Sequence, residues 1–178
     1  MSMNQPITQP VIKADGFTLR PMTKADAGQI TLYASDARVA KATKTIPHPL
    51  PDGVTEAFID RALSVDRTED VWVIDPSDDG SEVLGAIGLE RMDRNQSEIG
   101  YWVAPAAWNN GFASAAVSAI IEANPQACRT IFGAVFQDNP ASARVLTNAG
   151  FDYIGEAESF SVARGVTVPT WTYIKKLD

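Results

Sequence analysis

Apolar and polar positions in the first third of the chain predict one strand and two helices. Residues 17–21 alternate between apolar and polar side chains, the period of a strand with one buried face. A helix is predicted to begin after Thr23, because threonine caps helix N-termini and Asp26 adds an acid to the first turn. Residues 46–51 contain three prolines and predict a rigid, extended loop. Apolar side chains then recur at helical spacing over residues 54–65, which predicts the second helix.

The remaining two thirds predict a sheet with helices between some of its strands. Two apolar segments, 71–75 and 83–92, flank a polar turn, and a third strand over 97–103 completes an antiparallel meander. Beyond it the pattern predicts a helix over 111–123, a strand over 130–136, a helix over 140–149 capped by Gly150, and a hairpin of 151–162 and 168–177. This order predicts an α+β domain with three α/β/α layers around a mixed, mainly antiparallel sheet.

The length of 178 residues suits a single domain, and we find neither an internal repeat nor a linker. We expect residues 1–12 to form a flexible N-terminal tail and residues 13–178 to form the domain. No apolar run approaches the ~20 residues that cross a membrane. The polar start, Met1 to Pro10, has neither the basic region nor the apolar segment of a signal peptide. A cytoplasmic protein without membrane contact is therefore expected.

Charge and composition exclude several classes of partner. The formal net charge is −7 and no Lys/Arg run occurs, which argues against nucleic acid and favours amine-bearing partners. With one cysteine, Cys128, and one histidine, His48, the chain has no disulfide framework and no nitrogen- and sulfur-rich zinc site. Its carboxylates show no calcium-loop spacing, so we expect no metal. We expect Cys128 to be buried and inert.

The segment 101–113 is the strongest candidate for chemistry. It runs from a predicted strand through a loop marked by Pro105 into a helix that opens at Gly111. Free amides and the positive end of the helix dipole converge at such a helix start, and a glycine lets an anion approach the backbone. The segment therefore predicts a phosphate-binding loop.

Four segments together resemble the GNAT superfamily of acyl-CoA-dependent N-acetyltransferases, and within it the RimJ/RimL-like branch of ribosomal-protein N-terminal acetyltransferases. They are Leu19–Met22 with Asp26, Ile46–Pro49, Ile99–Ala113, and Asn139–Phe151 with Asn139, Ser142, Arg144, Val145, Leu146 and Gly150 at the family spacing. The resemblance spans roughly residues 17–151. It implies a sheet that splays open at the acyl-CoA site and acetyl-CoA as the donor substrate.

The acyl-CoA motif of the family can be assigned residue by residue. Trp108 occupies its first position, as in the branch, and Gly111 and Ala113 its fourth and sixth. Asn110 replaces the Lys or Arg common there, so backbone amides should carry most of the diphosphate contact. The side chain of Trp108 could instead be a hydrophobic plug beneath the loop. The cofactor-binding residues implied by the resemblance are Tyr101, Trp102, Val103, Trp108, Asn109, Asn110, Gly111, Phe112, Ala113, Asn139 and Ser142.

The resemblance also implies direct attack of an amine on acetyl-CoA within a ternary complex. Glu98 is the candidate base, with a solvent-facing strand position as its alternative, and Glu90, which could instead pair with a neighbouring arginine, is the second choice. Leu146 stands where the family usually has a general-acid tyrosine. The hydroxyl of Ser142 could donate a proton, contact the cofactor, or only serve the first turn of its helix.

Fewer sequence features indicate which residues bind the acceptor substrate. His48 and Tyr101 are candidate substrate-binding residues, although His48, between two prolines, could equally pack against its loop. The branch implies a protein or peptide N-terminal α-amine as the acceptor. A polyamine or an aminoglycoside-like amine is the alternative, and a non-catalytic acyl-CoA-binding module is the competing class. A monomer and a homodimer are both compatible with the sequence.

Overall fold

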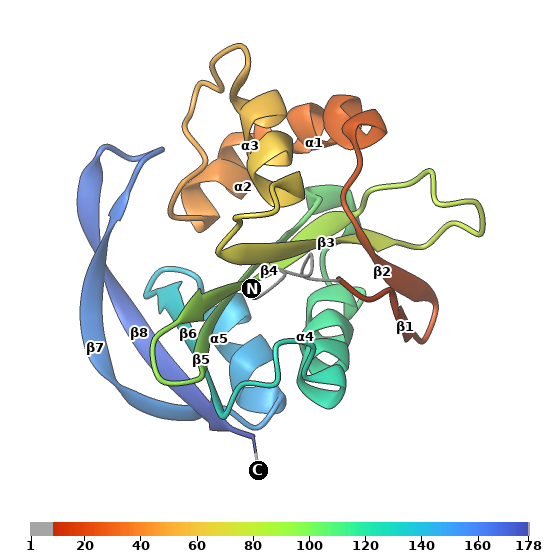
Figure 1. Ribbon diagram of the computed structural model, residues 1–178. Helices are drawn as coiled ribbons and strands as arrows, with labels where there is room; N and C mark the ends of the chain where they lie inside the picture. Colours follow the sequence, from red (N-terminus) through yellow and green to blue (C-terminus); the bar gives the residue numbers. More distant parts are fainter. Residues whose placement is uncertain (1–8, 178) are drawn as a thin grey trace, which may run out of the picture.

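The computed structural model describes residues 9–177, in which eight strands form one sheet in the order β1-β2-β3-β4-β5-β6-β8-β7 (Figure 1). The strands are β1 Ile12–Ala14, β2 Phe17–Pro21, β3 Glu69–Asp75, β4 Gly85–Met92, β5 Gln96–Val103, β6 Thr130–Phe136, β7 Asp152–Ser161 and β8 Val166–Lys176. Only the β5–β6 pair is parallel, and the other neighbouring strands are antiparallel. The predicted mixed, mainly antiparallel sheet is confirmed.

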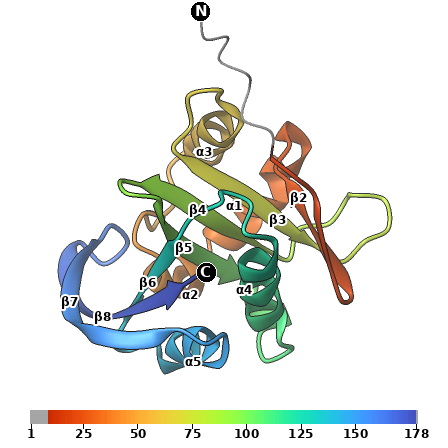
Figure 2. The same cartoon turned by 60° about the horizontal axis from the view of Figure 1, so that its bottom comes forward.

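Helices cover both faces of this sheet. They are α1 Ala27–Ala34, α2 Ala37–Ala42, α3 Val54–Leu63, α4 Phe112–Ala123 and α5 Pro140–Asn148, with short 3₁₀ turns at Lys24–Asp26 and Pro105–Ala107. Helices α1–α3 lie on one face, and α4 and α5 lie on the other (Figures 1 and 2). Each face therefore has its own core. The larger core includes Trp72, Ile87, Leu89, Ile120 and Leu146, and the smaller one includes Met22, Ile30, Ile59, Val73 and Ala86. The three-layer α+β prediction is confirmed.

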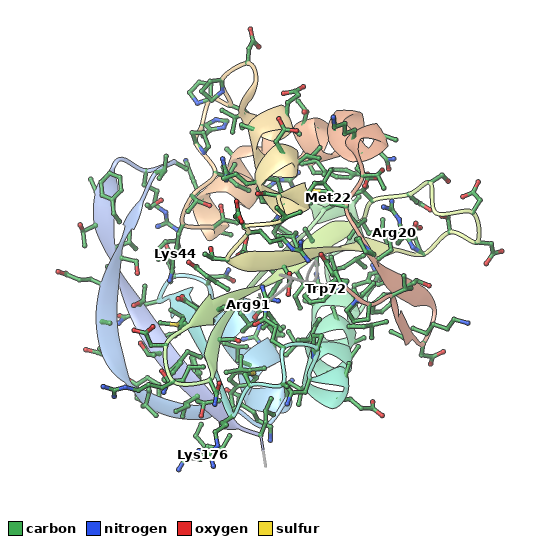
Figure 3. The ribbon with its side chains drawn as sticks, in the orientation of Figure 1. Arg20, Met22, Lys44, Trp72, Arg91 and Lys176 are labelled. Carbon is green, nitrogen blue, oxygen red and sulfur yellow. The ribbon has the colours of Figure 1, made fainter. Side chains whose placement is uncertain are left out.

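The junction between β2, the first helix and β3 depends on Arg20. Its guanidinium pairs with Asp75 at 2.7 Å and with Asp26 at 2.8 Å (Figure 3 labels Arg20). Burial is the largest single influence on the Asp26 carboxyl and opposes its ionisation, but the hydrogen bonds from Arg20 and Thr23 and the charge of Arg20 together outweigh burial and lower the pKa. Asp26 also accepts the backbone N–H of Thr23 at 2.8 Å, which places the helix start where the sequence predicts it.

Three local predictions need correction. The sequence pattern misses β1 and the six-residue α2, because elements this short show too little periodicity. Strand β3 begins at Glu69 rather than at residue 71. Of the tail expected over residues 1–12, residues 1–8 lie outside the described part of the chain. The following residues contact the sheet, since the Gln9 side chain donates to the carbonyl of Val71 and Ile12 pairs with Leu19.

Candidate active site

Strands β5 and β6 separate in the middle of the sheet. They are paired from Gln96 opposite Thr130 to Ile99 opposite Gly133, and the pairing stops there. Beyond that point β5 continues beside β4, and β6 continues beside β8. The backbone edge of β5 that follows Ile99 is therefore free to form strand-like hydrogen bonds with an extended ligand.

Two cavities meet at this separation. The loop cavity, about 520 Å³, is lined by residues 107–109 and 111–114 together with parts of α2 and α5. The sheet cavity, about 270 Å³, lies between the sheet and the layer of α1–α3 with the loop that follows α2. Their shared wall consists of Ala42, Tyr101, Trp102, Asn139 and Ser142. Two molecules, one bound in each cavity, could thus contact each other at this wall.

The loop cavity ends at the start of α4. Gly111 caps this helix with a φ of 78°, and Asn109 has a φ of 63°, so the loop uses left-handed backbone at two positions. A Cβ on Gly111 would meet no atom within 4 Å, which leaves open space next to the backbone. Helix α4 has no acid in its first turn. Its free N–H groups and its dipole therefore favour an anion here.

Trp108 and Asn110 hold the shape of this loop. The indole Nε1 of Trp108 donates to the carbonyl of Val103 at 2.7 Å, and 42% of the residue is exposed. The alternative of a hydrophobic plug is therefore wrong, because the ring lies at the surface with its polar atom bonded. The Asn110 amide donates to the carbonyls of Ala107 and Trp108 at 3.2 Å, and Asn110 is not among the lining residues of the loop cavity.

Cationic side chains also line the loop cavity, and most of them lie outside the predicted cofactor motifs. The guanidinium of Arg38 lies 5.6 Å from the centre of the Trp108 ring, and Lys41 and Arg144 line the same cavity. Arg38 and Lys41 belong to α2, the helix that the pattern did not reveal. Helix α2 thus places positively charged side chains beside the loop, although Arg38 is itself paired with Asp36 at 2.8 Å.

Two hydroxyl groups face each other on the shared wall. The Tyr101 hydroxyl donates to the carbonyl of Ser142 at 3.0 Å and lies 2.9 Å from the Ser142 Oγ. Burial raises the pKa of Tyr101 to about 12, and the hydrogen bond to Ser142 offsets only part of this rise. Asn139 caps α5 by accepting the backbone N–H of Ser142 at 3.3 Å. Strand β5 and helix α5 together place a protonated phenol at the wall.

Three carboxylates line the sheet cavity from three adjacent strands. Strand pairing places Glu69 opposite Glu90, and Glu90 opposite Glu98. Burial raises the pKa of Glu69, and the negative charge of Glu90 raises it further. The carboxyl group of Glu69 lies over Gly88, where a Cβ would come within 3.0 Å of it. Phe58 and Trp102 also line this cavity, and so does Arg61, whose guanidinium lies 6.0 Å from the centre of the Phe58 ring.

Glu98 already has a cationic partner. The Nζ of Lys44 lies 2.9 Å from its Oε1, and both side chains are about one third exposed, at 36% and 33%. The loop that carries Lys44 is held by the tip of the β7–β8 hairpin. The backbone N–H of Val162 donates to the Lys44 carbonyl at 3.0 Å, and Arg164 donates to the Lys41 carbonyl at 2.8 Å.

Some predicted residues lie away from the cavities. His48 is exposed, and neither cavity has it among its lining residues. Arg91 pairs with Asp70, not with Glu90 as the alternative for Glu90 would require. Cys128 is buried, as expected, and its Sγ donates to the side chain of Asn124.

Comparison with known families decides the identity of the fold. Residues 17–152 match the acetyltransferase (GNAT) domain family. The chain belongs to the GNAT acetyltransferases. The family resemblance seen in the sequence is therefore confirmed, and the protein is an acyltransferase. In this GNAT domain the acyl-CoA motif, residues 99–113, forms the part of β5 that separates from β6 and the loop before α4.

A curated relative covers nearly the whole GNAT domain. The uncharacterized N-acetyltransferase YoaA of Bacillus subtilis (strain 168) is 27% identical over 169 residues, which are 92% of this chain and 95% of YoaA.

Solved structures share the fold at low sequence identity. The microcin C7 self-immunity acetyltransferase MccE, in complex with acetyl-CoA and AMP, has a TM-score of 0.81 at 17% identity and covers 96% of this chain and 98% of its own. RimL, a ribosomal L7/L12 alpha-N-protein acetyltransferase in complex with coenzyme A, has a TM-score of 0.80 at 14% identity, with coverages of 95% and 99%. The spermidine N-acetyltransferase of Vibrio cholerae, in complex with CoA and spermine, has a TM-score of 0.77 at 16% identity, with coverages of 92% and 96%.

The described residues offer neither a cluster of metal ligands nor a helix that could span a membrane. Residues 9–177 contain no group of three or more His, Cys, Asp or Glu side chains placed to hold a metal ion. None of the helices that the structure describes has the length and apolar character that crossing a membrane requires.

Proposed function

We propose that this GNAT domain transfers the acetyl group of acetyl-CoA to a cationic primary amine by direct attack in a ternary complex. The observation that carries the proposal is the shared wall of the two cavities. One cavity ends at an anion-binding helix start, and the other contains three carboxylates. The donor and acceptor sites would then touch at Tyr101, Asn139 and Ser142.

The residues around the loop cavity fit acetyl-CoA. Backbone N–H groups from Asn109 to Ala113 and the dipole of α4 would bind the diphosphate, with Arg38 supplying nearby positive charge. The pantetheine arm would hydrogen-bond through its amides to the free backbone edge of β5 at 101–103, in the way that an additional strand pairs with a sheet edge. The arm would then reach the shared wall between β5 and β6.

The two sides of the wall have complementary roles in proton transfer. Glu98 would accept a proton from the acceptor ammonium, since only the neutral amine is nucleophilic. The Tyr101–Ser142 hydroxyl pair would supply a proton to the leaving thiolate, a role that the phenol can fill because its pKa of about 12 keeps it protonated. A backbone N–H of β5 beyond Ile99 would polarise the acetyl carbonyl.

We propose a protein or peptide N-terminal α-amine as the acceptor. The sheet cavity provides carboxylates for its ammonium, and RimL, a ribosomal L7/L12 alpha-N-protein acetyltransferase, shares the fold. A polyamine is the second candidate. The specific observation in its favour is the row Glu69–Glu90–Glu98, which could bind several ammonium groups along one molecule.

Release of free CoA thiol from acetyl-CoA tests the proposal across an amine panel. The panel contains peptides with free and blocked N-termini, spermidine, spermine and an aminoglycoside. Turnover only with free N-terminal peptides supports the first acceptor, and turnover with polyamines supports the second. Binding of CoA in calorimetry without turnover of any amine would instead favour a non-catalytic acyl-CoA-binding module.

A further inference from the structure

The sheet cavity contains an amine that belongs to the protein. The ammonium of Lys44 lies 2.9 Å from Glu98, the carboxylate proposed to accept the proton of an acceptor amine. Glu98 immediately precedes Ile99, after which β5 and β6 separate. Lys44 and the wall residues Tyr101 and Ser142 line the same cavity. The Lys44 ammonium therefore occupies the position that an acceptor ammonium would need.

The backbone around Lys44 is held in place while its side chain enters the cavity. Hydrogen bonds from Val162 and Arg164 hold the carbonyls of Lys44 and Lys41, and Arg164 is in turn paired with Asp138. Figure 3 shows Lys44 below the layer of α1–α3, at the end of the sheet near the β7–β8 hairpin. An amine anchored in this way reacts as part of the same molecule, without the cost of bringing two molecules together.

We propose that Lys44 is a self-acetylation site, an inference that rests on the proposed acetyltransferase function. The Lys44 ammonium loses one proton to Glu98, and the neutral Nζ forms a bond to the acetyl carbon of acetyl-CoA. The bond between that carbon and the CoA sulfur breaks, and the second proton lost from nitrogen goes to the thiolate. The products are N-acetyl-Lys44 and free CoA. The neutral amide no longer pairs with Glu98, and once Glu98 has released its proton to water its carboxylate becomes available to an external amine.

Mass spectrometry after incubation with deuterated acetyl-CoA, without any acceptor, tests this inference. Acetylation blocks tryptic cleavage between Lys44 and Thr45, so the label appears on a peptide that starts at Ala42. Lys13 and Lys24, both exposed, report background acetylation from solution. We expect Lys44 to be labelled at least about tenfold faster than these two, because intramolecular reactions benefit from proximity.

Two controls separate the proposed reaction from background. The rate per molecule should not change when the protein concentration is varied tenfold, and Glu98→Gln should slow labelling of Lys44 while leaving that of Lys24 unchanged. Unlabelled acetyl groups found on Lys44 after purification, but absent from Glu98→Gln protein, also support the inference.

Labelling of Lys44 no faster than Lys13 and Lys24 would overturn the inference. If the same preparation acetylates an amine of the panel, only the self-acetylation of Lys44 is wrong and the proposed function stands. If it binds CoA but acetylates neither an added amine nor Lys44, both are wrong.

Discussion

The hydroxyl of Tyr101 lies 2.9 Å from the Oγ of Ser142, so a strand and a helix present adjacent hydroxyl groups between two cavities. The family tyrosine that would otherwise donate a proton is replaced by Leu146, whose side chain is buried against Gly133. Tyr101 therefore provides a phenol from a different element, close to the place where the leaving sulfur would lie.

Removal of the phenol should slow catalysis and leave binding intact. Tyr101→Phe is expected to lower kcat by about ten- to a hundredfold, near the lower range of general-acid contributions, with the Kd for CoA changed little. Stopped assays of thiol release and calorimetry measure the two quantities. Tyr153→Phe, at an exposed position on β7, is the matched control. If Ser142→Ala is added, the double variant should lose little more than Tyr101→Phe alone, because the two hydroxyls act as a pair.

Glu98→Gln tests the proton acceptor. We expect kcat/KM to fall by at least about tenfold, and the remaining rate to rise with pH as more of the acceptor amine becomes neutral. Glu158→Gln on the exposed edge strand β7 provides a control for the same chemical change. An unaltered rate and pH profile for Glu98→Gln would mean that another group or bulk water accepts the proton.

Gly111 combines positive φ with open space where its Cβ would lie. Gly111→Ala should weaken CoA binding, because alanine resists this φ and its methyl group would project next to the anion site. Gly165→Ala imposes similar strain at a φ of 67° in the β7–β8 turn, also with no atom within 4 Å. Scanning calorimetry should show a similar decrease in Tm for both variants. Equal Kd values for CoA in the two variants would argue against the loop as its binding site.

Arg38 should contribute charge to binding of CoA. Arg38→Gln is expected to raise the Kd about three- to tenfold at low ionic strength, and less at 0.5 M salt, since an exposed charge is screened. Lys13→Gln, on β1, removes one positive charge away from the loop cavity. The prediction fails if the two variants have the same salt dependence in titration calorimetry.

Glu69 should make the stability of the fold decrease with pH. Its pKa is raised in the folded state above the ordinary value of 4.5, mainly by burial. Its stabilising contribution is therefore complete below the ordinary pKa and is lost as the pH rises through the raised pKa. Glu69→Gln should melt higher than the wild type at pH 8, by roughly 2–4 °C per kcal/mol regained, and the gain should shrink towards pH 4. A gain in Tm that is constant across this range would contradict the assigned cause.

The local signals in the sequence were strong enough for most of the framework. Alternation identified β2, apolar segments next to polar turns identified β3 and β4, and helical spacing identified α3, because these patterns are visible within single segments. The phosphate-binding loop was found from Gly111 and the strand before it. By contrast α2, with only six residues, was missed, and with it the charges of Arg38 and Lys41.

The predicted site was less complete on the acceptor side. Glu69 was missed because β3 was predicted to begin at residue 71, although Glu69 lies on the same face of this strand as Val71 and Val73. His48 stood out as the single imidazole, yet it lies exposed outside both cavities. Residue type alone cannot reveal which side of a loop faces a cavity, since loop conformation depends on contacts with distant elements.

The sequence by itself determined most of the elements, the helix start at Gly111 and the family, because each of these depends on residue spacing within short segments. Only the tertiary structure decided which side chains meet across the cavities. Lys44 and Glu98 are 54 residues apart, and Tyr101 and Ser142 are 41 apart. Such contacts depend on strand register and on the packing of helices against the sheet. A shift of one residue in register turns every side chain of a strand to the opposite face of the sheet. The register is fixed by contacts between distant segments, so the sequence of one segment cannot reveal it.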